Sequence, residues 1–247
     1  MPEYVSILSP LLDEDSLEVI TEICPDDGMH DYAPQIYFEA GRDALRVCRL
    51  AMLAAGLEKV ESILDFACGG GRALRYLKAA FPDAALTGVD ILAHQVEFCA
   101  RVFGATGVVS KGDPDKLGLE GPFDLIWCGS LLTHQDREMW GKVLALFERI
   151  ASPGGVVVFT AYGRYVAELL REGHNQLNLD ERQVEEILRQ YGETGFGYQK
   201  TRWDGDALAT RPWVCAQLNK VPALDLLLYF EHAWLGQDVI ACRKARP

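Results

Sequence analysis

A glycine-rich turn flanked by carboxylates is the part of the chain whose residue types point most directly to chemistry. Residues 63–72 read ILDFACGGGR, so that Asp65 precedes the glycines and Gly69 and Gly71 lie within the turn. Because glycine has no Cβ, a ligand can approach the backbone of such a turn closely. A helix that follows would direct its N–H groups and its positive dipole end toward that ligand. We therefore predict a cofactor-binding turn; a turn without a ligand is the alternative.

Two further aspartates follow the next two predicted strands. Asp90 closes the strand after the turn, and a carboxylate there can accept hydrogen bonds from both hydroxyls of a ribose; it could also cap the following helix. Asp113, in SKGDPD, could accept a hydrogen bond from an adenine amino group, or it could form an Asx turn before Pro114. The carboxyl ends of parallel strands share one edge of a sheet, so these acids are expected beside the turn.

The glycine spacing favours one cofactor class over another. A dinucleotide fingerprint requires a third glycine where this chain has Leu74, and Asp65 would repel a diphosphate. A cationic ligand would be attracted, and the ammonium and sulfonium groups of S-adenosylmethionine are cationic. A nicotinamide-dependent dehydrogenase or epimerase is the weaker alternative, since no Tyr-x-x-x-Lys pair was found.

His134 is the candidate catalytic residue. It follows the fourth predicted strand, which ends at Cys128 just before Gly129, and it could act as a base or orient an acceptor. A histidine that only bonds to the backbone is the alternative. No H-x-x-x-H pair or carboxylate cluster indicates a metal site, so we predict none.

These residues need a sheet to position them, and strand and helix patterns alternate through the middle of the chain. The strands read as apolar throughout, as expected when helices cover both faces, and this predicts an α/β fold with a doubly wound, mostly parallel sheet. Strands are predicted at 60–66, 85–89, 107–110, 123–128 and 155–160, and helices at 72–80, 92–103 and 136–150.

The two ends of the chain differ from this core. Helices are predicted near 17–23 and at 36–55, then at 164–171, 180–191 and 213–219, with a long loop over 192–209 and a closing antiparallel hairpin at 224–232 and 238–243. We expect four parts: an N-terminal helical extension (1–56), a cofactor-binding core (57–163), an insert that could act as an acceptor lid (164–223) and the hairpin (224–247).

The composition and charge of the chain limit the classes of partner that it can bind. The 247 residues carry a formal charge of −12, and we found no dense lysine and arginine stripe, which disfavours nucleic acid and anionic membranes. The apolar runs are too short for a membrane span, and the seven scattered cysteines suggest reduced thiols in a cytoplasmic protein.

The chain resembles the class I S-adenosylmethionine-dependent methyltransferases. Their first motif is commonly D-x-G-x-G-x-G, matched from Asp65 to Gly71 except that Ala67 replaces a glycine. Residues 123–134 and 152–161 resemble the fourth strand with its loop and the fifth strand with its preceding turn. The resemblance implies a Rossmann-like sheet of seven strands and S-adenosylmethionine as cofactor, with S-adenosylhomocysteine as product. The cofactor contacts would be Asp65, Ala67, Gly69, Gly71, Asp90, Ile91, Asp113, Cys128 and Gly129.

A narrower likeness concerns bacterial methyltransferase-domain proteins, which often occur with glycan-building enzymes. It is carried by residues 37–45, by GSLLTH and by LGQDVIACRK near the end. We therefore expect methylation of oxygen or nitrogen on a small-molecule or glycan acceptor. A non-catalytic cofactor-binding module is the alternative, and the sequence leaves the oligomeric state open.

Overall fold

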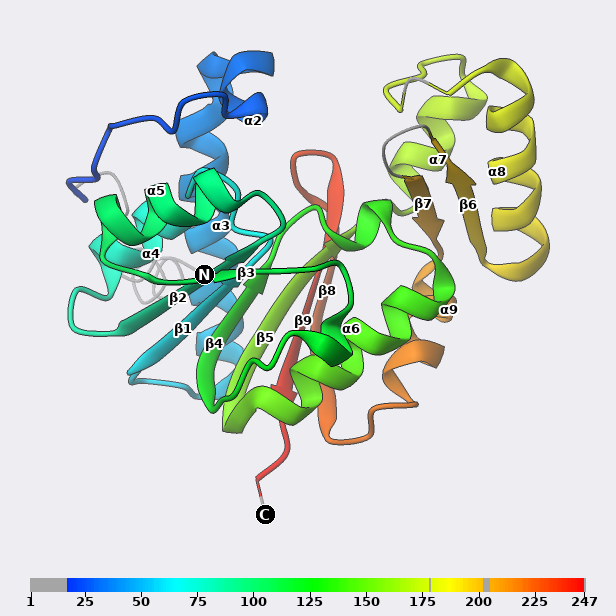
Figure 1. Ribbon diagram of the computed structural model, residues 1–247. Helices are drawn as coiled ribbons and strands as arrows, with labels where there is room; N and C mark the ends of the chain where they lie inside the picture. Colours follow the sequence, from blue (N-terminus) through cyan, green and yellow to red (C-terminus); the bar gives the residue numbers. More distant parts are fainter. Residues whose placement is uncertain (1–16, 178, 202–204, 247) are drawn as a thin grey trace, which may run out of the picture.

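A seven-stranded sheet runs through the centre of the computed structural model, which describes residues 17–177, 179–201 and 205–246 (Figure 1). The strand order is β3-β2-β1-β4-β5-β9-β8. Neighbouring strands are parallel from β3 to β5, and β9 runs antiparallel to β5 and β8, which confirms the predicted sheet and its closing hairpin. The strands are β1 (Ser62–Phe66), β2 (Ala85–Asp90), β3 (Thr106–Val109), β4 (Phe123–Cys128), β5 (Ala151–Ala161), β8 (Leu224–Trp234) and β9 (Gln237–Lys244).

Helices cover both faces of the sheet (Figure 1). Successive strand residues point to opposite faces, so Ile63 packs into the core beneath α3, α4 and α5, whereas Leu64 packs into the core beneath α6 and α9. Both positions are apolar because both faces are buried. The helices are α3 (Pro34–Ala55), α4 (Leu74–Ala80), α5 (Ala93–Phe103), α6 (Arg137–Ile150) and α9 (Arg211–Leu218), with short 3₁₀ turns η1 (Pro114–Lys116) and η2 (Leu132–His134).

The helix predicted near residues 17–23 is wrong, because this segment has no regular secondary structure and the first helix described is α2 (Gly28–Tyr32). The buried guanidinium of Arg75 explains the difference. Its Nη1 donates to the carbonyl oxygens of Ile20, at 2.7 Å, and Glu22, at 3.3 Å. Those carbonyls would otherwise accept bonds within a helix, so a residue far along the chain overrides the local preference.

The long loop predicted over 192–209 is also wrong. It contains β6 (Phe196–Lys200) and β7 (Gly205–Ala209), which pair as an antiparallel two-stranded sheet beside α7 (Arg164–Arg171) and α8 (Glu181–Thr194) (Figure 1). The β7 strand is buried on both sides: Leu208 packs with α7 and α8, and its neighbours Ala207 and Ala209 pack into the main core. Five buried residues in a row show no alternation, which concealed the strand in the sequence.

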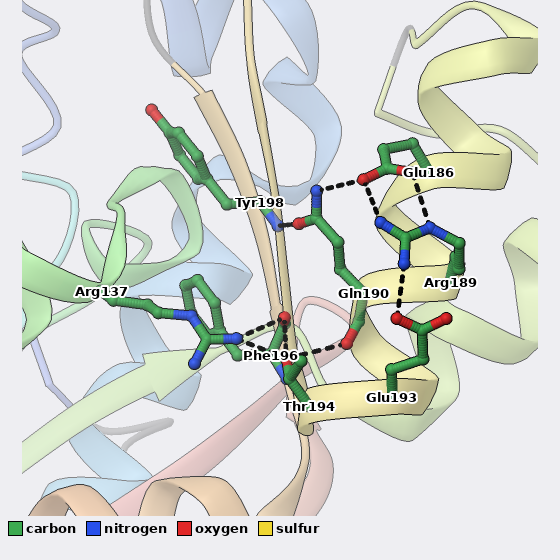
Figure 2. Close-up of polar contacts among 8 residues, drawn as sticks. All are labelled: Arg137, Glu186, Arg189, Gln190, Glu193, Thr194, Phe196 and Tyr198. Carbon is green, nitrogen blue, oxygen red and sulfur yellow. Dashed lines mark hydrogen bonds and ion pairs between the residues drawn. The ribbon is translucent and has the colours of Figure 1, made fainter.

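Arg137, the first residue of α6, joins this small sheet to the core (Figure 2). Its guanidinium donates to the Thr194 hydroxyl and, at 3.1 Å, to the Phe196 carbonyl oxygen. It also lies 5.0 Å from the centre of the Phe196 ring and 5.9 Å from that of Trp213. The end of α8 and the start of β6 are therefore held against the helix that follows η2.

Candidate functional site

A cleft opens at the carboxyl ends of β1, β2 and β4, at the point where the strand order reverses. It consists of a larger cavity of about 520 Å³ and a smaller cavity of about 380 Å³. The two cavities share Ala67, Asp90, Ile91 and Leu131 in their walls. Both volumes suit a small molecule or cofactor, and a reversal of strand order is where such ligands bind in doubly wound sheets.

The glycine turn connects β1 to α4 and forms one wall of the cleft. Ala67 adopts a left-handed backbone with φ of +70°, and its N–H donates to the Val89 carbonyl oxygen at 2.8 Å. Gly69, at φ +51°, borders the larger cavity. Gly71, at φ +80°, packs against Phe103 and does not face the cleft. It therefore contributes to the site by shaping the turn.

The N-terminal segment closes one side of the larger cavity. The Asp27 carboxylate accepts hydrogen bonds from the Tyr37 hydroxyl at 2.7 Å and from the Met29 N–H at 3.0 Å. A Cβ on Gly70 would overlap that carboxylate. The close approach therefore requires glycine, and it places Asp27 and Met29 in the cavity wall.

Asp90 borders both cavities and ties the glycine turn to the end of β2. Its two carboxylate oxygens accept hydrogen bonds from the N–H groups of Gly69, at 2.9 Å, and Leu92, at 3.0 Å. A carboxylate has about four acceptor sites, so two backbone donors leave room for hydroxyl groups of a ligand.

Asp65 lies in the wall of the larger cavity with 1% of its surface exposed. Its Oδ2 has no hydrogen-bond partner in the described part of the chain. Burial and, next, the negative charge of Asp90 raise the pKa of the Asp65 carboxyl to about 8, against the opposing effect of Arg72. A buried carboxyl with an unsatisfied oxygen favours a cationic group beside it.

The larger cavity is also lined by Arg72, Trp127 and Trp234, which were not among the predicted site residues. The Arg72 guanidinium lies 5.0 Å from the centre of the Trp234 ring, and burial lowers its pKa. The rings of Trp127 and Trp234 pack edge to face, with their centres 5.1 Å apart. Trp234 Nε1 donates to the Ala40 carbonyl oxygen at 2.8 Å. Arg72 could have been noticed directly after the glycines, whereas no local pattern indicates Trp234.

The other predicted cofactor contacts divide into two groups. Ile91, which is 64% exposed, borders both cavities, and Gly129 borders the larger one. The Cys128 side chain is instead fully buried in the core beneath α6. At the end of β4, Gly129 thus faces the cleft, whereas the adjacent Cys128 faces the core.

Asp113 lies beside the smaller cavity, but its carboxylate is engaged elsewhere. It accepts a hydrogen bond from the Asp115 N–H at 3.2 Å, which is the Asx turn that was the alternative interpretation. It also lies 3.1 Å from Lys116 Nζ and 3.8 Å from Lys142 Nζ. The hydrogen bond from Lys116 lowers its pKa most. Its neighbours Gly112 and Pro114 border the cavity instead.

His134 ends η2 and lines the larger cavity together with Asp65 and Gly69. Its Nδ1 lies 2.8 Å from the Gly205 carbonyl oxygen and 3.5 Å from Asp206 Oδ1. Asp206 belongs to β7, in the segment predicted to be a loop, so no local pattern indicates that the two residues pair.

Within the described ranges, no group of three or more histidine, cysteine, aspartate or glutamate side chains could hold a metal ion. No helix in the same ranges is long and apolar enough to cross a membrane.

Comparison with known proteins gives this geometry a family context. Residues 63–155 match the family model described as "Methyltransferase domain". The trans-aconitate 2-methyltransferase of Klebsiella pneumoniae (strain 342) is 34% identical over 62 residues, which cover 25% of this chain and 24% of that relative. The match thus spans about a quarter of the relative's length.

Two solved structures share the fold over nearly their whole length. An S-adenosylmethionine-dependent methyltransferase from Clostridium acetobutylicum ATCC 824 has a TM-score of 0.62 and 16% identity, and the match covers 90% of this chain and 99% of that one. CalS10, an amino pentose methyltransferase from Micromonospora echinaspora solved with bound S-adenosylmethionine, has a TM-score of 0.59 and 14% identity, with 87% and 97% covered.

Residues 63–155 are therefore similar to a methyltransferase domain, and the chain has the Rossmann-like fold of the solved S-adenosylmethionine-dependent methyltransferases.

Proposed function

We propose that this protein transfers a methyl group from S-adenosylmethionine to an oxygen or nitrogen atom of a small-molecule or glycan acceptor. The observation that carries the proposal is the buried, unpartnered Oδ2 of Asp65 in a cavity that Asp90 and the glycine turn also line. An ammonium group would satisfy that oxygen, whereas the diphosphate of a nicotinamide cofactor would be repelled by it.

The residues of the cleft suit the separate parts of the cofactor. In this proposal Asp65 holds the ammonium group, Arg72 holds the carboxylate, and Asp90 accepts hydrogen bonds from the ribose hydroxyls. The backbone of Ala67, Gly69 and Gly129 supplies close contacts. The smaller cavity suits an adenine ring because its wall is largely apolar, with side chains from Val89, Ile91, Leu131, Met139 and Val143.

When bound, S-adenosylmethionine supplies an electrophilic methyl group on a positively charged sulfur, and S-adenosylhomocysteine is the product. Because the leaving group is neutral, the chain needs to supply little acid catalysis. Its main task is to hold the acceptor in line with the methyl group and to exclude water. His134 lines the same cavity as Asp65 and is the candidate base for an acceptor that must lose a proton.

Three observations favour a small acceptor. The formal charge of −12 disfavours nucleic acid, and the larger cavity has the volume of a small-molecule site. The relatives named above act, by their names, on trans-aconitate and on an amino pentose. We further propose that residues 164–223 form the acceptor-facing part of the molecule, beside the core of 57–163.

A cytoplasmic location is part of the same proposal. All seven cysteines are unpaired, and all but Cys215 are buried, which suits a reducing compartment.

Calorimetric titration with S-adenosylmethionine and with NAD tests the cofactor assignment. We expect binding of the first only, weakened by Asp65→Asn and retained in Asp83→Asn, an exposed carboxylate at the opposite edge of the sheet. Binding of NAD would favour a dehydrogenase, and no response to either would refute the assignment. Binding of S-adenosylmethionine without methyl transfer to any of a broad set of hydroxyl and amine acceptors would favour a non-catalytic module.

A further inference from the structure

The hydrogen bond to Gly205 determines which nitrogen of His134 carries the proton. Nδ1 lies 2.8 Å from the carbonyl oxygen of Gly205, and a carbonyl oxygen can only accept a hydrogen bond. Nδ1 must therefore donate, so in the neutral ring the basic lone pair is on Nε2. His134 lines the larger cavity, and the hydrogen bond to Gly205 fixes the tautomer of its ring.

The carboxylate of Asp206 also lies close to His134 Nδ1. Asp206 is 6% exposed, and its Oδ1 lies 3.5 Å from His134 Nδ1. The strand that carries it, β7, is held just beyond the carboxyl end of β5, since the Ala209 N–H donates to the Tyr162 carbonyl oxygen at 2.8 Å and Leu208 forms a β-bridge with Tyr162. A buried negative charge at this distance stabilises a positively charged imidazole ring.

We propose that Asp206 is a positioning residue that holds His134 as a general base, and that the acceptor of the methyl group is a hydroxyl compound. This proposal rests on the proposed function and names its substrate class. In the step, an oxygen lone pair forms the new O–C bond while the C–S bond breaks and its electron pair remains on sulfur. The hydroxyl proton passes to His134 Nε2, and the imidazolium is stabilised by Asp206 until it returns the proton to water.

The chemistry of the acceptor groups explains why the dyad favours a hydroxyl. A carboxylate acceptor has already lost its proton, and a neutral amine attacks with its own lone pair, so neither needs a base during bond formation. Even a phenolic hydroxyl such as that of tyrosine ionises only near pH 10, and aliphatic hydroxyls ionise at still higher pH, so a hydroxyl acceptor is protonated at neutral pH. A base that works at neutral pH therefore assists only the hydroxyl acceptors among these three kinds.

Other charged and titratable groups lie around His134, and they define the background of its titration. Those in the cavity wall are Asp26, Asp27, Asp65, Arg72 and Asp90. Asp136 and Arg137 follow His134 closely in the chain, and the ring centre of Tyr162 lies 6.4 Å from that of His134. Asp206 is the carboxylate whose Oδ1 lies 3.5 Å from His134 Nδ1.

Long-range ¹H–¹⁵N NMR spectra of the wild-type protein test the dyad without cofactor or acceptor. The His134 signals are assigned by their loss in His134→Gln. We expect the neutral ring to carry its proton on Nδ1, and the midpoint of its titration to fall by roughly one pH unit or more in Asp206→Asn but not in Asp83→Asn. A proton on Nε2 in the wild type, or an unchanged midpoint in Asp206→Asn, would overturn the proposal.

An aminophenol tests the substrate class, because it presents a hydroxyl and an amine in one molecule. With labelled S-adenosylmethionine we expect the label on oxygen, and label on nitrogen would overturn the class. In Asp206→Asn, kcat should fall by about tenfold or more with the acidic limb of the pH profile moved to lower pH, a shift that a purely structural role would not produce.

Calorimetry separates this proposal from the one on which it rests. Asp206→Asn should bind S-adenosylmethionine as the wild type does, and loss of that binding would contradict a role confined to His134. If the wild type binds no S-adenosylmethionine, the proposed function fails, and the NMR result still decides whether the dyad exists.

Discussion

At the scale of single residues, Ala67 is the clearest departure from what its backbone requires. Its φ of +70° lies in the left-handed region, where a Cβ costs roughly 1 kcal/mol and glycine costs nothing. We expect Ala67→Gly to raise the thermal midpoint by about 1–2 °C, because relief of strain slightly exceeds the added freedom of the unfolded chain. Differential scanning calorimetry measures the effect.

The matched control is Ala79→Gly in α4, where the backbone is helical. It should lower the midpoint, since glycine is unfavourable inside a helix by roughly 0.5–1 kcal/mol. A lower midpoint in Ala67→Gly as well would show that Ala67 packing outweighs its strain.

The raised pKa of Asp65 predicts a pH dependence. In the ligand-free protein the carboxyl has a pKa of about 8, against about 3.9 in an unfolded chain. Between these values the folded protein holds a proton that the unfolded chain has lost, so this group lowers stability as pH rises through that window. An ammonium ligand requires the ionised form, so binding near pH 7 should release a proton.

We therefore expect the affinity for S-adenosylhomocysteine to rise from about pH 6 to about pH 7.5, where the ligand's own amino group is still protonated. Calorimetry in buffers of different ionisation enthalpy measures both the affinity and the proton release. Asp65→Asn should bind more weakly and without this pH dependence. A wild-type affinity that is constant over the window would argue against Asp65 as the ammonium site.

The residue scale also shows how far the sequence predicts the site. Asp65, Gly69 and Asp90 belong to one short stretch and the next strand end, and all three line the larger cavity as expected. Arg72 was not predicted, although it directly follows the glycines in the sequence. Asp206 comes to His134 only through tertiary packing of β7, which no local pattern encodes.

At the scale of elements, Arg137 connects α6 to the end of α8 (Figure 2). Arg137→Ala removes the hydrogen bond to the Phe196 carbonyl and the ring contacts with Phe196 and Trp213. We expect a loss of about 1–2 kcal/mol in the free energy of unfolding and faster proteolysis within residues 164–209. Urea denaturation and limited proteolysis measure the two effects.

Arg189→Ala is the control in the same group of side chains. Arg189 pairs with Glu186 and Glu193, but it is 53% exposed, and exposed ion pairs contribute little. A loss in Arg189→Ala equal to that in Arg137→Ala would mean that the number of contacts sets the stability of this unit, rather than the carbonyl hydrogen bond and ring contacts of Arg137.

Elements were predictable where burial on both faces produced apolar runs of ordinary length, as in β1 and β4. They were not predictable where a distant side chain supplies the hydrogen bonds, as Arg75 does for the N-terminal segment. The β7 strand was missed because it is buried on both sides within a glycine-rich and aromatic stretch, which resembles a loop in sequence.

At the scale of the whole molecule, the N-terminal segment and α3 both pack against the glycine turn, which lies further along the chain. The N-terminal segment contributes Asp27, α3 contributes Tyr37, and a Cβ on Gly41 of α3 would overlap the backbone just after the turn. Arg75 lies among them, with its guanidinium 5.1 Å from the centre of the Tyr37 ring. The cleft wall is therefore an assembly whose parts depend on close backbone approach.

Gly70→Ala tests that dependence, because the added Cβ would displace the Asp27 carboxylate and with it the segment that closes the larger cavity. We expect the affinity for S-adenosylhomocysteine to fall by about tenfold or more, and the rise in thermal midpoint at saturating ligand to shrink accordingly. Gly192→Ala, in α8 with open space around its Cβ position, should leave binding unchanged and raise the midpoint slightly. Unchanged binding in Gly70→Ala would mean that the N-terminal segment packs beside the cofactor site without contributing to it.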